Sequence, residues 1–174
     1  MSLSGKSAKN TGGIKCVLVG AGDHARVLID VINQLAFPEF EDWEIVALTD
    51  ANPETHGQSI MDVPVVGGDR ELPKLRDQGV SYGLVGVGLT AGTAKRAEVF
   101  KMLDAAGFVL PTLVHPAALI ASNVEIGAGS VILAGAIVGT GCRIGKNTII
   151  NIGACVSHDC VLEDHAVVSD GAHV

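Results

Sequence analysis

Aromatic residues are scarce in this chain and absent from its last third. The six that occur all precede residue 109, and only seven charged residues follow that point. A narrow coil has no room for aromatic rings, so the change in composition marks a domain junction near residues 110–116. We expect a first domain over residues 14–110 and a second domain, of different architecture, over residues 111–174.

Other absences limit the classes of function. No apolar run is long enough to span a membrane, and the leader, residues 1–13, is polar rather than shaped as a signal peptide. The net charge of −7 argues against nucleic acid or an anionic membrane as a partner. The four cysteines show no CxxC spacing, and we interpret Cys142 and Cys160, one coil apart, as free thiols. We therefore expect a cytoplasmic protein with a disordered leader.

A strict six-residue repeat runs through the last third. Its eleven aliphatic members are Val114, Ile120, Ile126, Ile132, Val138, Ile144, Ile150, Val156, Leu162, Val168 and Val174. A second set, four positions further on, contains only small or β-branched residues from Ala118 to Ala172. Neither an α-helix nor a hairpin sheet repeats every six residues. Three hexads instead form a triangular coil with one short strand per side, and stacked coils share one aliphatic core.

This pattern resembles the hexapeptide repeat of left-handed parallel β-helices. The left hand rests on that resemblance, because parallel crossovers are otherwise right-handed. Most proteins with this repeat resemble acyltransferases that use acyl-CoA or acyl-carrier protein. We therefore predict an α/β N-terminal Rossmann-like domain with a parallel sheet, followed by a left-handed parallel β-helix of hexapeptide repeats.

Strands and helices alternate in the first domain, which predicts a parallel sheet with helical crossovers. The expected strands are Ile14–Val19 and residues 43–50, 63–66 and 80–87, and the expected helices end near residue 35 and cover residues 69–78 and 93–106. Between the first strand and the first helix, the segment Gly20-Ala21-Gly22-Asp23-His24-Ala25 matches the G-x-G-x-x-A fingerprint. Its glycines allow a tight turn, and the start of the helix offers N–H groups to an anion.

The fingerprint alone is weak evidence for a dehydrogenase, because no second half and no dehydrogenase catalytic domain follow. A nucleotide or nucleotide-sugar diphosphate fits the anion site better, with Gly20 and Gly22 close to the phosphates. His24 is either a surface histidine or a residue that faces this ligand, and we favour the second. Asp50 ends the second strand, where it either accepts a hydrogen bond from a ribose hydroxyl or closes a turn.

A second candidate site lies inside the repeat, in the segment Asn151-Ile152-Gly153-Ala154-Cys155-Val156-Ser157-His158-Asp159-Cys160. We expect His158 at a corner of the prism, facing outward, with Asp159 beside it to orient the ring or stabilise its charge. Asn151 is expected close to the same edge. An imidazole with a pKa near 6.5 suits removal of a proton from an amine or hydroxyl that attacks a thioester.

Direct attack by the acceptor is favoured over a covalent enzyme intermediate. The thiolate of CoA is a good leaving group, so no intermediate is required. Cys155 has no cationic neighbour that would lower its pKa, and Ser157 has no base except the adjacent His158.

Four ordered motifs, G-A-G-D-H-A, T-D-A-N-P-E-T-H-G, V-P-V-V-G-G and N-I-G-A-C-V-S-H-D-C, resemble the NeuD/PglD-type sugar O- and N-acyltransferases, over residues 14–174. The resemblance implies an N-terminal domain that binds a nucleotide-sugar, a β-helix that binds acetyl-CoA without a metal, and a homotrimer with active sites between adjacent subunits. It assigns the general base to His158, its acidic partner to Asp159 and a supporting role to Asn151. It matches the glycine-loop histidine of the family to His24 and its acidic turn to Asp50.

The chain departs from this family at two points. The family's I-G-[DE]-x-x-H-I stretch reads Leu162-Glu163-Asp164-His165-Ala166-Val167-Val168, with His165 displaced and Val167 in the usual place of the histidine. Family members continue for further coils and a cap beyond the position of Val174, so we expect a truncated β-helix.

Two alternatives to a sugar acetyltransferase stay open. A zinc enzyme of the γ-carbonic-anhydrase type is also a trimeric left-handed β-helix, but it needs three histidines that converge on the metal. The candidates His158, His165 and His173 fall at different phases of the repeat, which disfavours convergence. The other alternative is a non-catalytic scaffold that binds a nucleotide-sugar.

Overall fold

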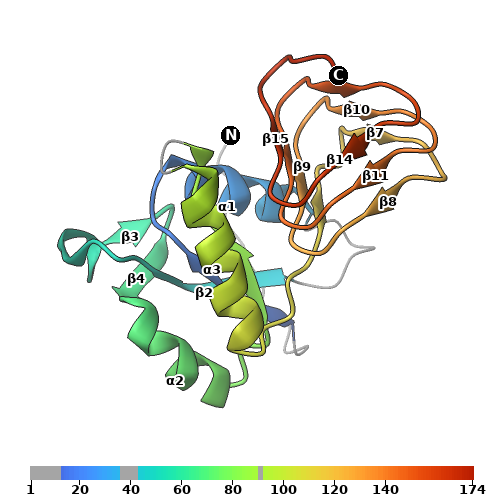
Figure 1. Ribbon diagram of the computed structural model, residues 1–174. Helices are drawn as coiled ribbons and strands as arrows, with labels where there is room; N and C mark the ends of the chain where they lie inside the picture. Colours follow the sequence, from blue (N-terminus) through green and yellow to red (C-terminus); the bar gives the residue numbers. More distant parts are fainter. Residues whose placement is uncertain (1–12, 36–42, 90–91) are drawn as a thin grey trace, which may run out of the picture.

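The computed structural model describes residues 13–35, 43–89 and 92–174, so the predicted leader lies outside the described residues except for Gly13. Figure 1 shows an α/β domain followed by a triangular coil whose strands stack toward the C-terminus. Among the helices of the described residues, none is long and apolar enough to cross a membrane.

A five-stranded sheet forms the centre of the N-terminal domain. Its order is β3-β4-β2-β1-β5, and neighbouring strands run parallel except for β3 and β4. The elements are β1 (Ile14–Val19), α1 (Asp23–Leu35), β2 (Trp43–Thr49), β3 (Ser59–Ile60), β4 (Val63–Gly67), α2 (Leu72–Asp77), β5 (Tyr82–Val85) and α3 (Thr93–Ala105). In β1, Cys16 and Leu18 pack in the core that contains α1, whereas Val17 and Val19 pack in the core that contains α2 and α3. The helices therefore cover both faces of the sheet.

Burial explains why the sequence predicts these elements. The second half of β1 is buried on both faces, so it reads as a continuous apolar run. α1 buries one stripe that includes Leu28 and Ile32. Three details differ from expectation: Asp69–Glu71 forms a 3-10 helix ahead of α2, β5 is shorter than residues 80–87, and β3 was not expected. A strand of two residues is too short to leave a periodic pattern.

The C-terminal part is a parallel β-helix with three faces. Face 1 consists of β6 (Leu113–Val114), β9 (Val131–Ile132), β12 (Ile149–Ile150) and β15 (Val167–Val168); face 2 of β7 (Leu119–Ile120), β10 (Ile137–Val138) and β13 (Cys155–Val156); face 3 of β8 (Glu125–Ile126), β11 (Arg143–Ile144) and β14 (Val161–Leu162). Each strand pairs with the strand one coil further on, as Ile137 pairs with Cys155. Ile132 and Ile150 are fully buried inside the prism. The left-handed β-helix predicted from the repeat is confirmed.

From its third turn on, the β-helix has one position with a left-handed backbone conformation in each turn. From residue 129 to residue 171, positive φ angles recur every six residues. Glycine occupies five of these positions, whereas Asn147, Asp159 and His165 occupy the others with φ of 52°, 58° and 65°. Asn, Asp and His tolerate this conformation better than most residues, but glycine adopts it without steric cost. Three turns therefore carry a side chain where glycine would be relaxed.

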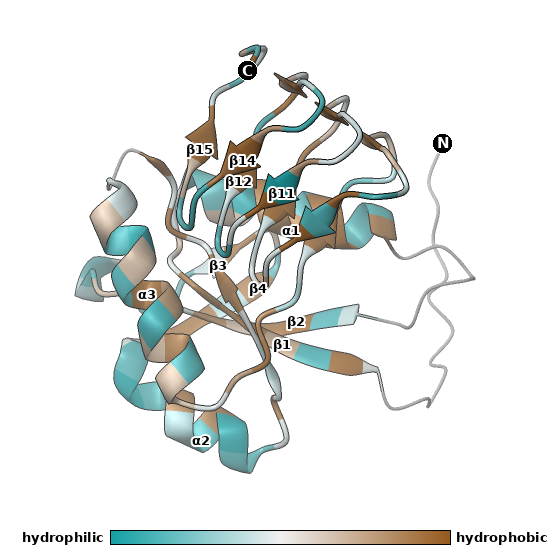
Figure 2. Cartoon of the chain, turned by 45° about the vertical axis from the view of Figure 1, so that its right-hand side comes forward, coloured by the Kyte–Doolittle hydropathy of each residue, from teal (hydrophilic) through white to brown (hydrophobic). Residues whose placement is uncertain are grey.

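Face 1 is covered by the N-terminal domain. Leu113, Val131 and Leu133 belong to the same buried cluster as Leu28 and Ile32 of α1. Figure 2 shows α1 beneath the β-helix, and most of the strands above it in the brown of apolar residues. Faces 2 and 3 are exposed in the single chain, which leaves two sides of the prism open to a partner.

Candidate active site

The two glycines of the fingerprint meet different surroundings. A Cβ atom on Gly20 would lie 2.9 Å from the carbonyl carbon of Gly86 and 3.0 Å from the nitrogen of Val87, and the φ of Gly20 is +107°. Gly20 is therefore required where the β1–α1 loop packs against the segment after β5. A Cβ on Gly22 would meet no atom within 4 Å, so the space beside Gly22 is open. Of the two, Gly22 is the one that leaves room for a ligand.

Asp50 clamps the glycine loop to the end of β2. Its Oδ2 accepts a hydrogen bond from the Ala21 N–H at 2.6 Å, and its Oδ1 accepts one from the Asn52 N–H at 2.7 Å. The carbonyl oxygen of Asp50 accepts from His56 Nε2 at 2.8 Å, since a carbonyl cannot donate. These contacts support the turn-closing interpretation of Asp50, while a ribose contact stays a prediction.

His24 is the second residue of α1 and lies next to the loop that follows β5. The helices that follow the adjacent strands β1 and β5, α1 and α3, cover opposite faces of the sheet, and parallel α/β sheets bind ligands at such a point. A Cβ on Gly88 would lie 3.0 Å from the Cβ of His24, so the two loops pack closely. His24 is largely buried, and its Nε2 has no hydrogen-bond partner among the described residues. This burial favours the ligand-facing interpretation over a surface histidine, and contact with a ligand stays a prediction.

The charge state of His24 follows from this burial. Loss of hydration, and to a lesser extent the nearby Arg96 charge, lower the pKa of His24 to about 4. The ring is therefore neutral at physiological pH. A buried, unpaired ring nitrogen is unfavourable unless a ligand or water completes it. The unpaired Nε2 of His24 is thus a candidate partner for a ligand or a water at the start of α1.

His158 and Asp159 occupy the turn after β13, at the corner where faces 2 and 3 meet. Their side chains are 72% and 75% exposed, and His158 Nδ1 lies 2.9 Å from Asp159 Oδ2. Because a carboxylate only accepts, Nδ1 carries the hydrogen and Nε2 keeps a free lone pair. The pair can therefore act as an oriented base that faces outward.

The coil below this corner makes room for it. A Cβ on Gly139 would lie 2.8 Å from the His158 nitrogen, and a Cβ on Gly141 would collide with the Asp159 carboxylate. The Asp159 N–H also donates to the Thr140 carbonyl at 2.8 Å. Sequence reasoning missed the two glycines, although their place one coil before Ser157 and Asp159 is readable from the repeat.

Asn151 does not join this corner. It lies in the turn after β12, where faces 1 and 2 meet, while His158 lies one turn later. The expectation that both share one edge is wrong for a single chain, because each turn of the triangle advances to the next corner. No hydrogen bond among the described residues links His158 to Asn151 or to His24.

Sequence reasoning also missed a buried polar junction between the domains. Arg96 of α3 is fully buried and bonds to Asn147 and to the Val87 carbonyl. Asn147 in turn bonds to Nδ1 of His165, in the turn between faces 3 and 1. His165 is therefore held away from the His158 corner, and His173 pairs with Cys155 on face 2. The three histidines of the zinc alternative lie at different places on the prism.

Comparisons with known proteins agree with this architecture. Residues 15–103 match the family described as the PglD N-terminal domain. A mutant GDP-perosamine N-acetyltransferase from Caulobacter crescentus, solved with CoA and GDP-perosamine, is 31% identical, with a TM-score of 0.82 over 96% of this chain and 73% of that chain. The acetyltransferase domain of PglB from Neisseria gonorrhoeae, solved with acetyl coenzyme A, is 31% identical, with a TM-score of 0.77 over 93% and 73%.

WeeI from Acinetobacter baumannii, at 21% identity and a TM-score of 0.71 over 91% of this chain and 70% of that chain, shares the fold. Among curated proteins, none matches the chain in sequence. The fold and the comparisons define a hexapeptide-repeat acyltransferase. The chain belongs to the NeuD/PglD-type family of sugar O- and N-acyltransferases.

Proposed function

We propose that the protein transfers an acetyl group from acetyl-CoA to an amino or hydroxyl group of a nucleotide-linked sugar. The observation that carries the proposal is the exposed pair of His158 and Asp159, in which Asp159 leaves Nε2 of the ring free to accept a proton. Of the similar structures above, the GDP-perosamine N-acetyltransferase was solved with CoA and GDP-perosamine, and the PglB acetyltransferase domain was solved with acetyl coenzyme A. The first supports the acceptor class proposed here, and both support the donor.

The reaction follows from the arrangement of the pair. The acceptor nitrogen or oxygen attacks the thioester carbonyl while His158 Nε2 removes its proton. Asp159 stabilises the imidazolium that forms. The tetrahedral intermediate then collapses, the C–S bond breaks, and the imidazolium returns its proton to the CoA thiolate. The products are the acetylated sugar and CoA, with no acetyl group left on the protein.

The N-terminal domain supplies the acceptor site. The open space at Gly22 lies at the start of α1, where N–H groups favour a phosphate. His24 is the second residue of the same helix, and its Nε2 has no hydrogen-bond partner among the described residues. We infer that the diphosphate lies over Gly22 and that Asp50 acts first as the clamp of the loop, with a ribose contact as a second role.

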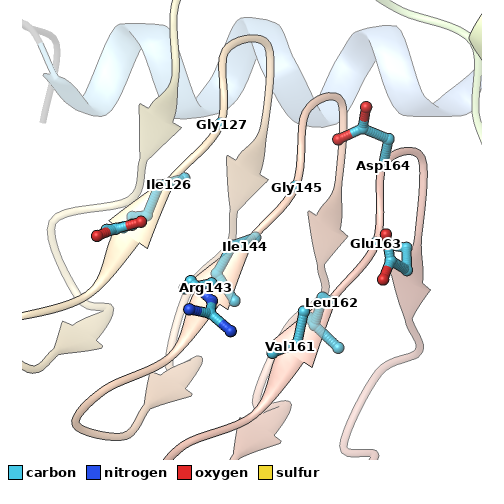
Figure 3. A pocket seen from close by; sticks show the side chains of 10 residues that line it. Ile126, Gly127, Arg143, Ile144, Gly145, Val161, Leu162, Glu163 and Asp164 are labelled. Carbon is cyan, nitrogen blue, oxygen red and sulfur yellow. The ribbon is translucent and has the colours of Figure 1, made fainter.

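A homotrimer would complete the active site. Face 2 presents exposed apolar side chains, with Leu119 66% and Ile137 45% exposed. Face 3 carries a shallow groove of about 370 Å³, and Figure 3 shows Arg143 and Val161 on successive strands there and Asp164 at the bordering turn. The His158 corner lies between these two faces. A ring of three subunits that pairs face 2 with face 3 of the next copy would bring a partner surface beside His158.

We expect Ile137→Lys to break this assembly, because it puts a charge in the centre of an apolar contact. Sedimentation at micromolar concentration should give a trimer for the wild type and a folded monomer for the variant. Lys101→Glu, at an exposed position of α3 outside faces 2 and 3, provides a charge-change control. A monomeric wild-type protein with full transferase activity would contradict the shared site.

The predicted domains, 14–110 and 111–174, the acetyl-CoA requirement and the cytoplasmic location belong to the same proposal.

The test of function is an acetyl-transfer assay with UDP- and GDP-linked 4-amino sugars, in which a thiol reagent measures release of CoA. We expect release that depends on one of the sugars and is lost in His158→Ala. Ser157→Ala, in the same turn, should keep activity, since no covalent intermediate is needed. Tight binding of a nucleotide-sugar without transfer to any acceptor would favour the scaffold alternative.

A further inference from the structure

Arg96 is a buried cation whose hydrogen bonds go to neutral groups. It lies in the first turns of α3 and is fully buried. Among the described residues its guanidinium donates to the carbonyl of Val87 at 2.5 Å, to Oδ1 of Asn147 at 2.8 Å and to the carbonyl of Asn147 at 3.3 Å. Burial lowers the pKa of Arg96 to about 10, which still leaves it charged at neutral pH. A buried cation with no carboxylate to pair with destabilises the fold, so a structural or functional role for Arg96 is expected.

Those contacts fix the orientation of the Asn147 amide. A guanidinium only donates, so the amide atom that faces Arg96 must be the oxygen, and the nitrogen must face the other way. Nδ2 of Asn147 lies 2.9 Å from Nδ1 of His165 and 3.3 Å from the carbonyl of Arg96. Because Nδ2 donates, Nδ1 of His165 must accept. The ring of His165 therefore carries its hydrogen on Nε2.

The backbone supports this arrangement at an energetic cost. Asn147 and His165 both occupy left-handed turn positions that glycine holds in five other turns of the β-helix. The His165 ring also packs edge-on against Phe100 of α3, with ring centroids 5.6 Å apart. The ring is thus held by one hydrogen bond and one aromatic contact, and the hydrogen bond leaves Nε2 unused.

A groove of about 520 Å³ lies beside this ring, between the first half of α3 and the turn from β14 to β15. Its lining is Leu89, Thr93, Ala94, Ala97, Glu163, Asp164, His165, Ala166 and Val167. Nε2 of His165 makes no hydrogen bond among the described residues and is not a buried unpaired atom. The groove therefore combines apolar walls with a donor, and the two carboxylates at its rim disfavour an anion.

The groove adjoins the proposed acceptor site along the chain. Leu89 lines the groove, and the preceding Gly88 packs against His24 at the start of α1. A nucleotide-sugar whose diphosphate lies at Gly22 would extend its sugar in this direction. Small apolar side chains can pack against the C–H face of a sugar ring, while a hydrogen-bond donor can bond to one of its hydroxyl oxygens.

We propose that Arg96 and Asn147 are positioning residues that hold His165 with its hydrogen on Nε2, and that this donor binds a hydroxyl oxygen of the acceptor sugar in the groove between α3 and the β14–β15 turn. The identity of the ligand rests on the proposed function. The position of the hydrogen on the His165 ring rests on which atoms donate and accept in the hydrogen bonds of Arg96 and Asn147. Arg96 thereby connects Val87, in the segment that follows β5, to the β-helix turn that contacts the sugar.

The state of the ring is tested by long-range ¹H–¹⁵N correlation of the histidine side chains at pH 8. His165→Asn, which tolerates the left-handed turn, identifies the His165 signals. We expect the hydrogen on Nε2 in the wild type. Asn147→Asp keeps the shape and the bond to Arg96 but offers oxygen to Nδ1, so His165 should then carry a hydrogen on Nδ1. A wild-type ring with its hydrogen on Nδ1, or an unchanged ring in Asn147→Asp, would overturn the assignment.

The role of the donor is tested by calorimetric titration with GDP-perosamine and GDP, or with a UDP-linked 4-amino sugar and UDP if these bind more tightly. Asn147→Asp and His165→Asn should weaken the nucleotide-sugar roughly 3- to 10-fold, as expected for one hydrogen bond, and leave the nucleoside diphosphate within about twofold. Asn123→Asp is the matched control, because Oδ1 of Asn123 only accepts hydrogen bonds, from Thr140 and Gly141.

Equal affinity of a folded Asn147→Asp variant for the nucleotide-sugar would refute the sugar contact. These readouts do not depend on turnover. A wild type that binds the nucleotide-sugar through His165 but transfers no acetyl group would contradict the proposed function and leave the positioning roles of Arg96 and Asn147 supported.

Discussion

The glycine loop and the β-helix corner each present a histidine, in opposite states. His24 is largely buried, its pKa is lowered to about 4, and its Nε2 has no partner among the described residues. His158 is exposed and paired through Nδ1 with Asp159. The His24 ring is neutral and its Nε2 lacks a hydrogen-bond partner, which suits the binding of a ligand. The second ring keeps a free lone pair beside a carboxylate, which suits proton transfer. Surroundings, rather than residue type, assign the two roles.

The largest expected effect is at the corner. His158→Ala should lower kcat by on the order of 10²–10⁴-fold, the usual range for a positioned general base. The fold should survive, because the exposed side chain is not part of the aliphatic stack. The KM for acetyl-CoA should change little. Steady-state kinetics at neutral pH measures both constants, and full activity in the variant would remove His158 from the mechanism.

The glycine loop gives the next effect, through a matched pair. Gly22→Val should fold normally, because the space beside Gly22 is open, and should weaken nucleotide-sugar binding about 100-fold by displacing the phosphate from one or two charge-assisted hydrogen bonds. Gly20→Ala should instead destabilise the fold by about 3 kcal/mol, because of its φ of +107° and the contact with Gly86. Titration calorimetry measures the affinity of Gly22→Val for the nucleotide-sugar, and thermal unfolding measures the stability of Gly20→Ala. Loss of acetyl-CoA binding in Gly22→Val would contradict two separate sites.

His24 should make stability depend on pH. Its pKa is about 4 in the folded protein against 6.5 for the free side chain, so between these values the unfolded chain binds a proton that the folded chain does not. Stability therefore falls as pH falls from 6.5 to 4. His24→Gln removes this term, so between pH 7 and pH 4 it should lose about 3 kcal/mol less than the wild type. Urea unfolding measures the difference, and parallel pH curves would show that His24 is not buried as described.

Asp159 should have the smallest effect. Asp159→Asn keeps a residue that tolerates the left-handed turn and removes only the charge that stabilises the imidazolium, so we expect a loss of roughly tenfold in kcat, well below that of His158→Ala. Asp159→Gly, which relaxes the turn, serves as the control for backbone effects. A loss in Asp159→Asn as large as in His158→Ala would mean that the carboxylate is indispensable for the base.

The parts of the molecule that the sequence predicts are those with a repeated or local signal. The six-residue repeat specifies the prism because every aliphatic position faces the same core, and adjacency alone pairs His158 with Asp159. The bond from Arg96 to Asn147 joins residues 51 positions apart, and no local pattern predicts it. Asn151 was misplaced because a distance of seven residues carries the chain past one corner of the triangle. The recurring turn glycines, interrupted at Asn147, Asp159 and His165, were a readable signal of side chains with a role.

The central claim is that acetyl passes directly from the thioester to the sugar at the His158 corner. A single-turnover reaction with radiolabelled acetyl-CoA, excess enzyme and an accepted nucleotide-sugar, stopped by rapid acid quench, tests it most directly. We predict label that moves from acetyl-CoA to the nucleotide-sugar with no protein-bound label at any time, and a rate slowed by at least about 100-fold in His158→Ala. Acetyl label that accumulates on Cys155 or Ser157 before it reaches the sugar would contradict the account.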